Sequence, residues 1–175
     1  MKKPANPWAV PVAIDEIPDS GLHIEIEAPA EVRTEVARVA GIRELPQLAA
    51  VFDLSRRGAA VHVSGTVKAR VGQTCVVTLE PVENAVEEPV DLLFTPQAAE
   101  TEPPEAAEAD GEPPEPLVGG KVDLGAIAIE FLNLGIDPYP RKPGAEFAAR
   151  QEDTGGSRPF AALDALKKGP GGKKP

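Results

Sequence analysis

The sequence predicts a single α+β domain in which an antiparallel sheet of meandering strands packs with two helices. Three observations lead to this prediction. Residues 61–71 alternate apolar and polar side chains, as in a strand with one buried face. Residues 123–134 instead repeat apolar side chains at helical spacing. Between them, residues 96–116 are acidic and rich in proline, so we expect a disordered insertion within one domain.

The N-terminal part is predicted to contain an extended segment, a strand and a helix. Residues 1–20 hold several prolines around Trp8, which we interpret as a packing anchor on a neighbouring sheet. Residues 22–26 alternate in the manner of a half-buried strand. The next apolar repeat has helical spacing and consists of Val32, Val36 and Val39 or Ala40. Gly41 can end this helix, which begins after Pro29.

The remaining strands of the sheet are predicted from alternation and from turn-forming residues. They are expected at residues 48–54, 61–71 and 86–94, with turns at residues 55–58 and 83–85. Gly65 interrupts the apolar row of the longest strand. A glycine at such a position indicates a bulge or a close approach of another backbone.

The second helix has recognisable signals at both ends. Asp123 can cap it by accepting a backbone N–H of the first turn. Its apolar face is predicted to consist of Leu124, Ile127, Phe131 and Leu134. Gly135 can adopt the left-handed conformation that ends a helix, and Ile136 can then fold back onto Phe131. We therefore expect the helix to end at Leu134.

A proline-rich arm follows this helix. Each proline fixes its own φ and restricts the residue before it, so the arm is expected to be stiff and extended. Its prolines are Pro138, Pro140 and Pro143. Between and beside them stand Tyr139, Arg141 and Lys142. An aromatic ring beside two cations can stack on an unpaired base while holding phosphate, although a plain surface turn has the same composition.

Charge is distributed unevenly along the chain. The formal net charge of −10 argues against a general nucleic-acid binder, because binding to phosphate requires clustered cations. Residues 98–116 contain seven acids and no base, whereas residues 141–175 contain eight bases and four acids. We therefore predict a domain of residues 1–147 and a flexible basic tail of residues 148–175, in which residues 158–166 can form a short amphipathic helix.

Cysteine content and hydropathy indicate the cellular compartment of the protein. Cys75 is the only cysteine, so one chain can form no disulfide, and its apolar neighbours indicate burial. No apolar run is long enough to span a bilayer, and residues 1–20 contain no apolar signal segment. These features predict a soluble, cytoplasmic protein. No sequence pattern indicates a cofactor or a metal site.

Few residues have the pattern of a catalytic site. His23 and His62 are expected on the wet faces of strands and are interpreted as ordinary surface histidines. Glu130 could act as a general acid if burial raised its pKa, but no partner is visible, and a solvated face or a salt bridge to a basic side chain is the preferred interpretation. No catalytic residue is predicted from these observations.

Several stretches resemble a known family. The block VDLGAIAIEFLNLGIDPYPRKPGAEF at residues 122–147 is similar to the signature of the YceD-like family, the bacterial large ribosomal RNA subunit accumulation proteins. Residues 63–82, the position of the acidic insertion and RPFAALDALKK at residues 158–168 fit the same family. Many members have Cys-x-x-Cys-Leu where this chain has Cys75-Val-Val-Thr78-Leu79, so the second cysteine is absent. A metal or redox role at Cys75 is therefore not expected.

The resemblance implies a role in the synthesis, processing or accumulation of large-subunit (23S) ribosomal RNA. Our leading hypothesis is a non-enzymatic assembly factor that contacts precursor ribosomal RNA or a basic ribosomal protein. Phosphate contacts are predicted from Arg141, Lys142, Arg150 and Arg158. Tyr139 would supply a stacking surface, and Glu130 would face a partner.

Two alternatives remain open from the sequence. One is a metal-dependent nuclease in which Glu130 and Asp137 bind the metal, although two acids do not by themselves form a ligand cluster. The other is an adaptor that binds only protein, through the acidic insertion or the tail helix.

Overall fold

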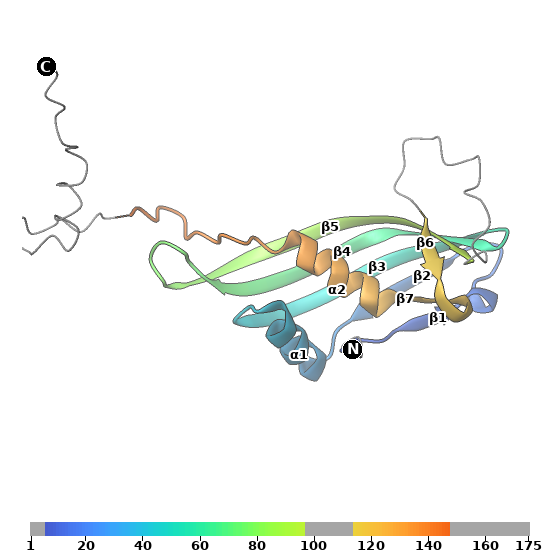
Figure 1. Cartoon of the computed structure of the whole chain (residues 1–175), viewed down its shortest axis with the longest axis horizontal. Helices are drawn as coiled ribbons and strands as arrows, with labels where there is room; N and C mark the ends of the chain where they lie inside the picture. The colour runs from blue at the N-terminus through green and yellow to red at the C-terminus, as the bar shows by residue number, and fades with distance from the viewer. Residues whose placement is uncertain (1–5, 97–113, 148–175) are drawn as a thin grey trace, which may run out of the picture. The chain divides into compact units, whose positions relative to one another are not determined.

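A computed structural model describes residues 6–96 and 114–147 (Figure 1). The described elements belong to one compact unit that extends to Ala145. The interior of the acidic insertion, the predicted tail helix, Arg150 and Arg158 lie outside the described residues. In chain order the elements are β1 (Pro11–Ala13), a 3₁₀ turn (Ile14–Glu16), β2 (Leu22–Glu27), α1 (Ala30–Ala40), β3 (Glu44–Arg57), β4 (Ala60–Thr74), β5 (Pro81–Pro96), β6 (Glu115–Leu117), a 3₁₀ turn (Val118–Gly120), β7 (Lys121–Asp123) and α2 (Leu124–Gly135).

The main sheet has five strands in the order β2-β3-β4-β5-β6. The first four strands pair antiparallel, whereas the short β6 pairs parallel with the end of β5. A separate antiparallel pair joins β1 to β7. The predicted α+β class with two helices is thus confirmed, and the sheet is mixed where a purely antiparallel one was expected.

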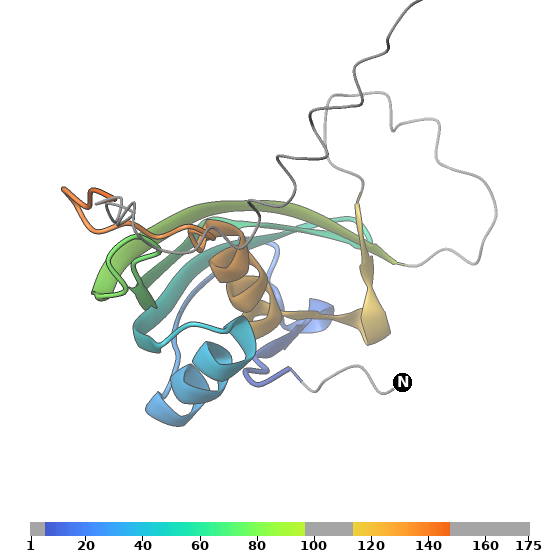
Figure 2. The ribbon, with the colours of Figure 1, turned by 60° about the vertical axis from the view of Figure 1, so that its left-hand side comes forward.

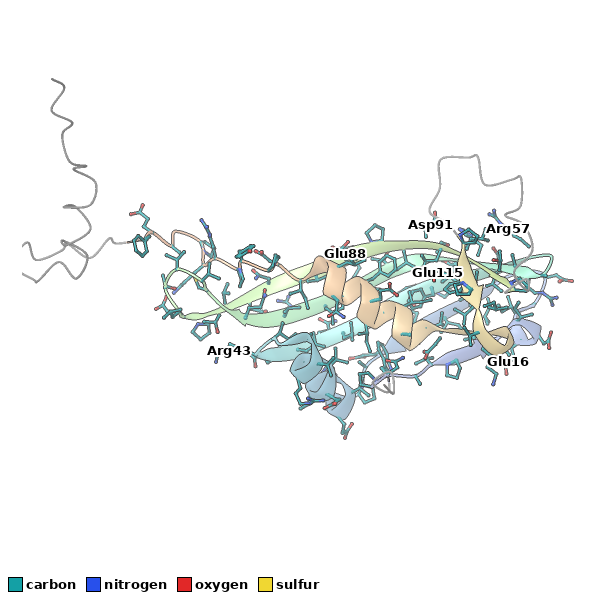
Figure 3. All side chains as sticks on the ribbon, in the orientation of Figure 1. Glu16, Arg43, Arg57, Glu88, Asp91 and Glu115 are labelled. Atoms are coloured by element: carbon teal, nitrogen blue, oxygen red, sulfur yellow. The ribbon has the colours of Figure 1, made fainter. Side chains whose placement is uncertain are left out.

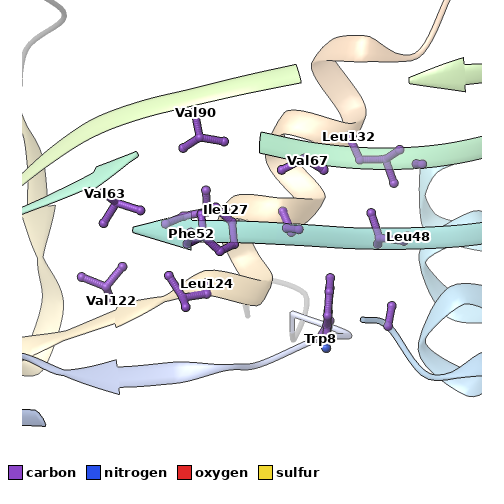
Figure 4. Close-up of a cluster of buried hydrophobic side chains, with 14 of the residues drawn as sticks. Trp8, Leu48, Phe52, Val63, Val67, Val90, Val122, Leu124, Ile127 and Leu132 are labelled. Atoms are coloured by element: carbon purple, nitrogen blue, oxygen red, sulfur yellow. The ribbon is translucent and has the colours of Figure 1, made fainter. Parts of the chain in front are cut away.

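Both helices and the β1-β7 pair lie on one face of the main sheet (Figure 2). The core fills the space between them (Figure 4). On the sheet side it is formed by alternate residues of the long strands, including Phe52, Val63 and Val67, which are inaccessible to solvent. Trp8 packs into this core from the N-terminal segment with 6% of its surface exposed, as the sequence predicted. Burial of these side chains supplies most of the stabilisation of the fold.

Gly65 is required for the packing of Phe52, its cross-strand partner. A β-carbon at Gly65 would meet the backbone oxygen of Val51 at 2.1 Å and the ring of Phe52 at 3.0 Å. The interruption in the apolar row therefore marks a close backbone approach, which is one of the two expectations from the sequence.

Helix α1 ends where the sequence predicted. Gly41 has φ of 70°, a left-handed conformation that glycine adopts without steric cost, and its N–H bonds to the carbonyl of Ala37. The buried face differs in one position, because Val36 and Ala37 are buried while Val39 is 55% exposed. Since residues 36 and 37 both face the sheet, the apolar repeat continues to Ala40, which is half-buried, and not to Val39.

Helix α2 begins as predicted but ends differently. The Asp123 carboxylate accepts the N–H groups of Gly125 and Ala126, which confirms the cap. Gly135 is the last helical residue and is not left-handed, so the predicted stop is wrong. Its absent β-carbon instead allows β5 to approach, because a β-carbon there would meet Val86 Cγ1 at 2.4 Å.

The buried face of α2 also needs a correction. Leu124 and Ile127 are buried as expected, and Phe131 is half-buried. Leu134, which was predicted to be buried, is 71% exposed, whereas Leu132 is completely buried. The wrong assignment follows from the highly apolar sequence of this helix, in which more than one stripe has helical spacing.

The strands are longer than predicted, and one turn lies elsewhere. The turn expected at residues 83–85 is part of β5, and the chain reverses at residues 75–80 instead. The turn expected at residues 55–58 also begins later, because β3 continues to Arg57. Within the described residues, no helix is both long and apolar enough to cross a membrane.

Candidate functional site

The proline-rich arm, residues 137–142, lies along the loop that joins β4 to β5 (Figure 1). We call this loop, residues 75–80, the hairpin loop. The N–H of Val76 donates to the carbonyl of Pro140 at 2.9 Å, and Pro140 is buried. Because the prolines prevent the chain from continuing as a helix, the arm is free to follow the loop in an extended form.

Polar side chains at the base of the hairpin hold the start of the arm. Gln73 donates through Nε2 to the carbonyl of Asp137 at 2.7 Å, and its own Oε1 accepts from Asn84 Nδ2 at 3.1 Å. Gln73 is only 8% exposed. A buried amide with both ends hydrogen-bonded fixes the position of its partners, because a lost bond would leave a desolvated polar atom.

Cys75 joins the other end of the arm to the hairpin loop. Its Sγ accepts the N–H of Lys142 at 3.3 Å and the N–H of Thr78 at 3.4 Å. These donors, with the backbone of Lys142 contributing most, lower the pKa of the Cys75 thiol to about 6. The predicted burial of Cys75 is confirmed, and its sulfur also serves as a hydrogen-bond acceptor for the arm.

An ion pair completes the attachment. Lys142 Nζ lies 2.9 Å from Glu80 Oε2, and both side chains are about half exposed. The hydrogen bond between them raises the pKa of Lys142 and lowers that of Glu80. Lys142 is therefore protonated at neutral pH, and Glu80 already balances part of its positive charge.

The attachment leaves a set of side chains facing solvent. We call these residues the hairpin–arm surface: Val76, Leu79, Tyr139, Arg141 and Lys142. Leu79 is 76% exposed and Tyr139 is 71% exposed. Leu79 also has φ of 61°, the only positive φ outside glycine among the described residues. An exposed leucine in a strained conformation is costly for folding alone, and such strain is concentrated at functional sites.

Two other predicted residues, Glu130 and Asp137, are not part of this surface. Glu130 is exposed on α2 and makes none of the contacts that hold the arm. Asp137 caps the turn of the arm by accepting the N–H of Tyr139 at 2.8 Å. In residues 6–96 and 114–147, no group of three or more His, Cys, Asp or Glu side chains could hold a metal ion.

The two histidines are on the sheet surface, and each has a carboxylate partner on the next strand. His23 Nδ1 lies 2.7 Å from Asp53 Oδ1, and His62 Nε2 lies 2.7 Å from Asp91 Oδ1. The hydrogen bond to Asp53 raises the pKa of His23.

Sequence reasoning missed the residues that hold the arm. Gln73 continues the buried row of Val67, Ala69 and Val71, so a polar residue at its position was a detectable signal of a specific hydrogen bond. The contact of Cys75 with Lys142 had no such signal, because it joins residues 67 positions apart.

The hairpin loop and the arm both fall within the region that matches a known family. The sequence model of the family described as "Large ribosomal RNA subunit accumulation protein YceD" matches residues 63–167. The chain belongs to the YceD family. The YceD match begins within β4 and includes β5, α2 and the whole hairpin–arm surface. The family description implies a role in large ribosomal RNA subunit accumulation. No curated protein and no solved structure matches the chain.

Proposed function

We propose that this YceD protein is a non-enzymatic factor that supports accumulation of large-subunit ribosomal RNA by contacting precursor RNA through the hairpin–arm surface. The observation that carries the proposal is the attachment of the arm to the hairpin loop. The proposal is supported by the backbone contact between the two segments and by the exposure of Leu79 on the loop and of Tyr139, Arg141 and Lys142 on the arm.

The chemistry of this surface favours unpaired RNA. Tyr139 offers a ring on which a base can stack, and Arg141 can hold a neighbouring phosphate. Leu79 and Val76 supply apolar contact to a base or ribose. Because the contacts between arm and loop already fix the backbone, little further ordering is needed when RNA binds.

The role is expected to be one of binding and not of catalysis. Cys75 has a low thiol pKa, but its sulfur is buried beneath the arm and is used as a hydrogen-bond acceptor. Purified protein incubated with precursor RNA and magnesium or manganese should leave the RNA intact. Cleavage of the RNA that is lost in a Glu130→Gln, Asp137→Asn variant would contradict this part of the proposal.

A direct binding test should use the exposed residues and spare the attachment. Tyr139→Ala should weaken binding of a short single-stranded RNA roughly tenfold, since base–aromatic stacking contributes about 1–3 kcal/mol per base. Arg141→Glu should lower the slope of log affinity against log salt by about 0.7 for a lost phosphate contact. Reversing Lys142 is less informative, because Glu80 would then face a second carboxylate.

Arg57→Glu is the matched control. Arg57 is also exposed, but it ends β3 at the opposite end of the sheet from the arm (Figure 3). In cells, ultraviolet cross-linking followed by sequencing should show discrete positions on large-subunit precursor RNA for the wild type and for the control. Equal cross-linking by the Tyr139→Ala, Arg141→Glu variant would remove this surface as the RNA contact.

A further inference from the structure

The face of the main sheet opposite α1 and α2 is uncovered among the described residues (Figure 2). We call it the open sheet face. It consists of alternate side chains of four strands, and none of them is buried. They are His23, Glu25 and Glu27 on β2, Gln47, Ala49, Val51, Asp53 and Ser55 on β3, His62, Ser64, Thr66, Lys68 and Arg70 on β4, and Glu83, Ala85, Glu87, Pro89, Asp91 and Leu93 on β5.

The open sheet face is strongly acidic. The residues named above carry six carboxylates and two cations. Glu44 and Arg57, which continue the β3 row at its two ends by register, add one charge of each sign, so the net charge is −4 with both histidines neutral. Lys68 and Arg70 are already paired across strands, Lys68 with Glu87 at 3.0 Å and Arg70 with Glu83 at 2.8 Å. The negative charge that remains is therefore concentrated on β2 and around the two histidine–aspartate pairs.

Apolar side chains, together with Thr66, lie between these charges. Val51, Thr66 and Pro89 are neighbours in one row across three strands, and Glu25 stands beside Val51 at the edge. Val51 is 38% exposed and Leu93, farther along β5, is 37% exposed. An apolar centre with charges around it matches the composition of a protein interface, which has an apolar core and a polar rim.

The charge decides what can cover this face. Phosphate would be repelled by the carboxylates, so RNA does not fit it. A second copy of the chain related by two-fold symmetry would bring the same acidic residues together. A lysine- and arginine-rich protein segment would complement the carboxylates with its cations and the central row with its aliphatic side-chain stems.

We propose that the open sheet face docks a basic, extended protein segment, at a surface separate from the RNA contact at the hairpin loop. With both surfaces occupied, the protein would hold a basic polypeptide beside precursor RNA while its own carboxylates shield the cations of that polypeptide. The proposal goes beyond the RNA contact and does not depend on it.

The test uses a peptide of alternating lysine and valine as the probe, with a glutamate–valine peptide as its counterpart. The lysine peptide should shift backbone amide NMR signals of β2 and β3 at low salt, and the glutamate peptide should not. Glu25→Gln, Glu27→Gln and Asp53→Asn together should weaken the lysine peptide roughly tenfold, because each exposed charge pair contributes up to about fivefold. Rising salt should weaken the wild type more than this variant.

The matched control removes three exposed acids from other elements, by Asp19→Asn, Glu31→Gln and Glu146→Gln. It should bind the lysine peptide nearly as tightly as the wild type. Three outcomes would overturn the proposal: an equal loss of peptide affinity in both triple variants, NMR signal changes confined to the helices, or no binding of the lysine peptide at low salt. Single-stranded RNA should shift signals of the hairpin loop and leave β2 unchanged, and shifts at β2 would show that nucleic acid is the occupant. The RNA contact at the hairpin–arm surface and the peptide contact at the open sheet face can thus be refuted independently of each other.

Discussion

Replacing Asp123 by alanine should loosen the attachment of the N-terminal segment as well as the start of α2. One oxygen of its carboxylate accepts the N–H groups of Gly125, Ala126 and Val10, the last at 2.9 Å, and the other accepts Asn6 Nδ2 at 3.1 Å. Loss of a helix cap costs about 1 kcal/mol. Loss of a hydrogen bond to a charged acceptor costs about 1.5–3 kcal/mol. We expect a total of roughly 3 kcal/mol, reduced where water reaches the half-buried site.

The assay is thermal unfolding followed by tryptophan fluorescence, because Trp8 is the single tryptophan and lies next to the segment that Asp123 holds. Asp123→Ala should lower the Tm by about 10 °C and shift the Trp8 emission to the red before global unfolding. Asp123→Asn retains an acceptor oxygen, so its loss of stability should be less than half that of Asp123→Ala. Asp19→Ala serves as the surface control. A loss below about 0.5 kcal/mol with unchanged emission would refute the reasoning.

Four further outcomes are expected. Gly65→Ala should destabilise the protein by about 1–3 kcal/mol in urea unfolding, because its β-carbon would meet a backbone oxygen at 2.1 Å. The free energy of unfolding of wild type should exceed that of Cys75→Ser by a margin that grows as pH rises from about 6 towards 9. In this range the Cys75 thiol binds fewer protons in the folded protein than in the unfolded chain. A difference in stability that does not change with pH would contradict the low pKa of Cys75. The pKa of His23, followed by NMR, should fall in Asp53→Asn. Leu79→Asn should raise stability by up to about 1 kcal/mol by relieving the left-handed strain, while RNA binding weakens.

The sequence predicted those features that depend on local patterns. The alternation of residues 61–71 identified β4 and its buried face, and Asp123 identified the start of α2. Gly41 identified the end of α1 in the same way. Each of these signals lies within a few residues of the structure that it produces, so tertiary context had little opportunity to override it.

Features that depend on packing between distant segments were not predictable in this way. Gly135 has the pattern of a left-handed stop, but the approach of Val86 decides its role. Leu134 and Leu132 are equally apolar, and only the position of the sheet selects the one that is buried. The arm was recognised from its prolines and cations, whereas its attachment through Gln73 required knowledge of which loop lies beside it.

The parallel pairing of β6 with the end of β5 has a consequence for variation in this chain. Phe94 is the register partner of Glu115, so the sheet itself fixes the two strands on either side of residues 97–113. Residues can therefore be added or removed between these strands without displacing α2. Each doubling of the intervening length costs only about 0.6 kcal/mol in closure entropy. This point of the chain is consequently the natural place to insert a fluorescent or affinity module that leaves both proposed surfaces intact.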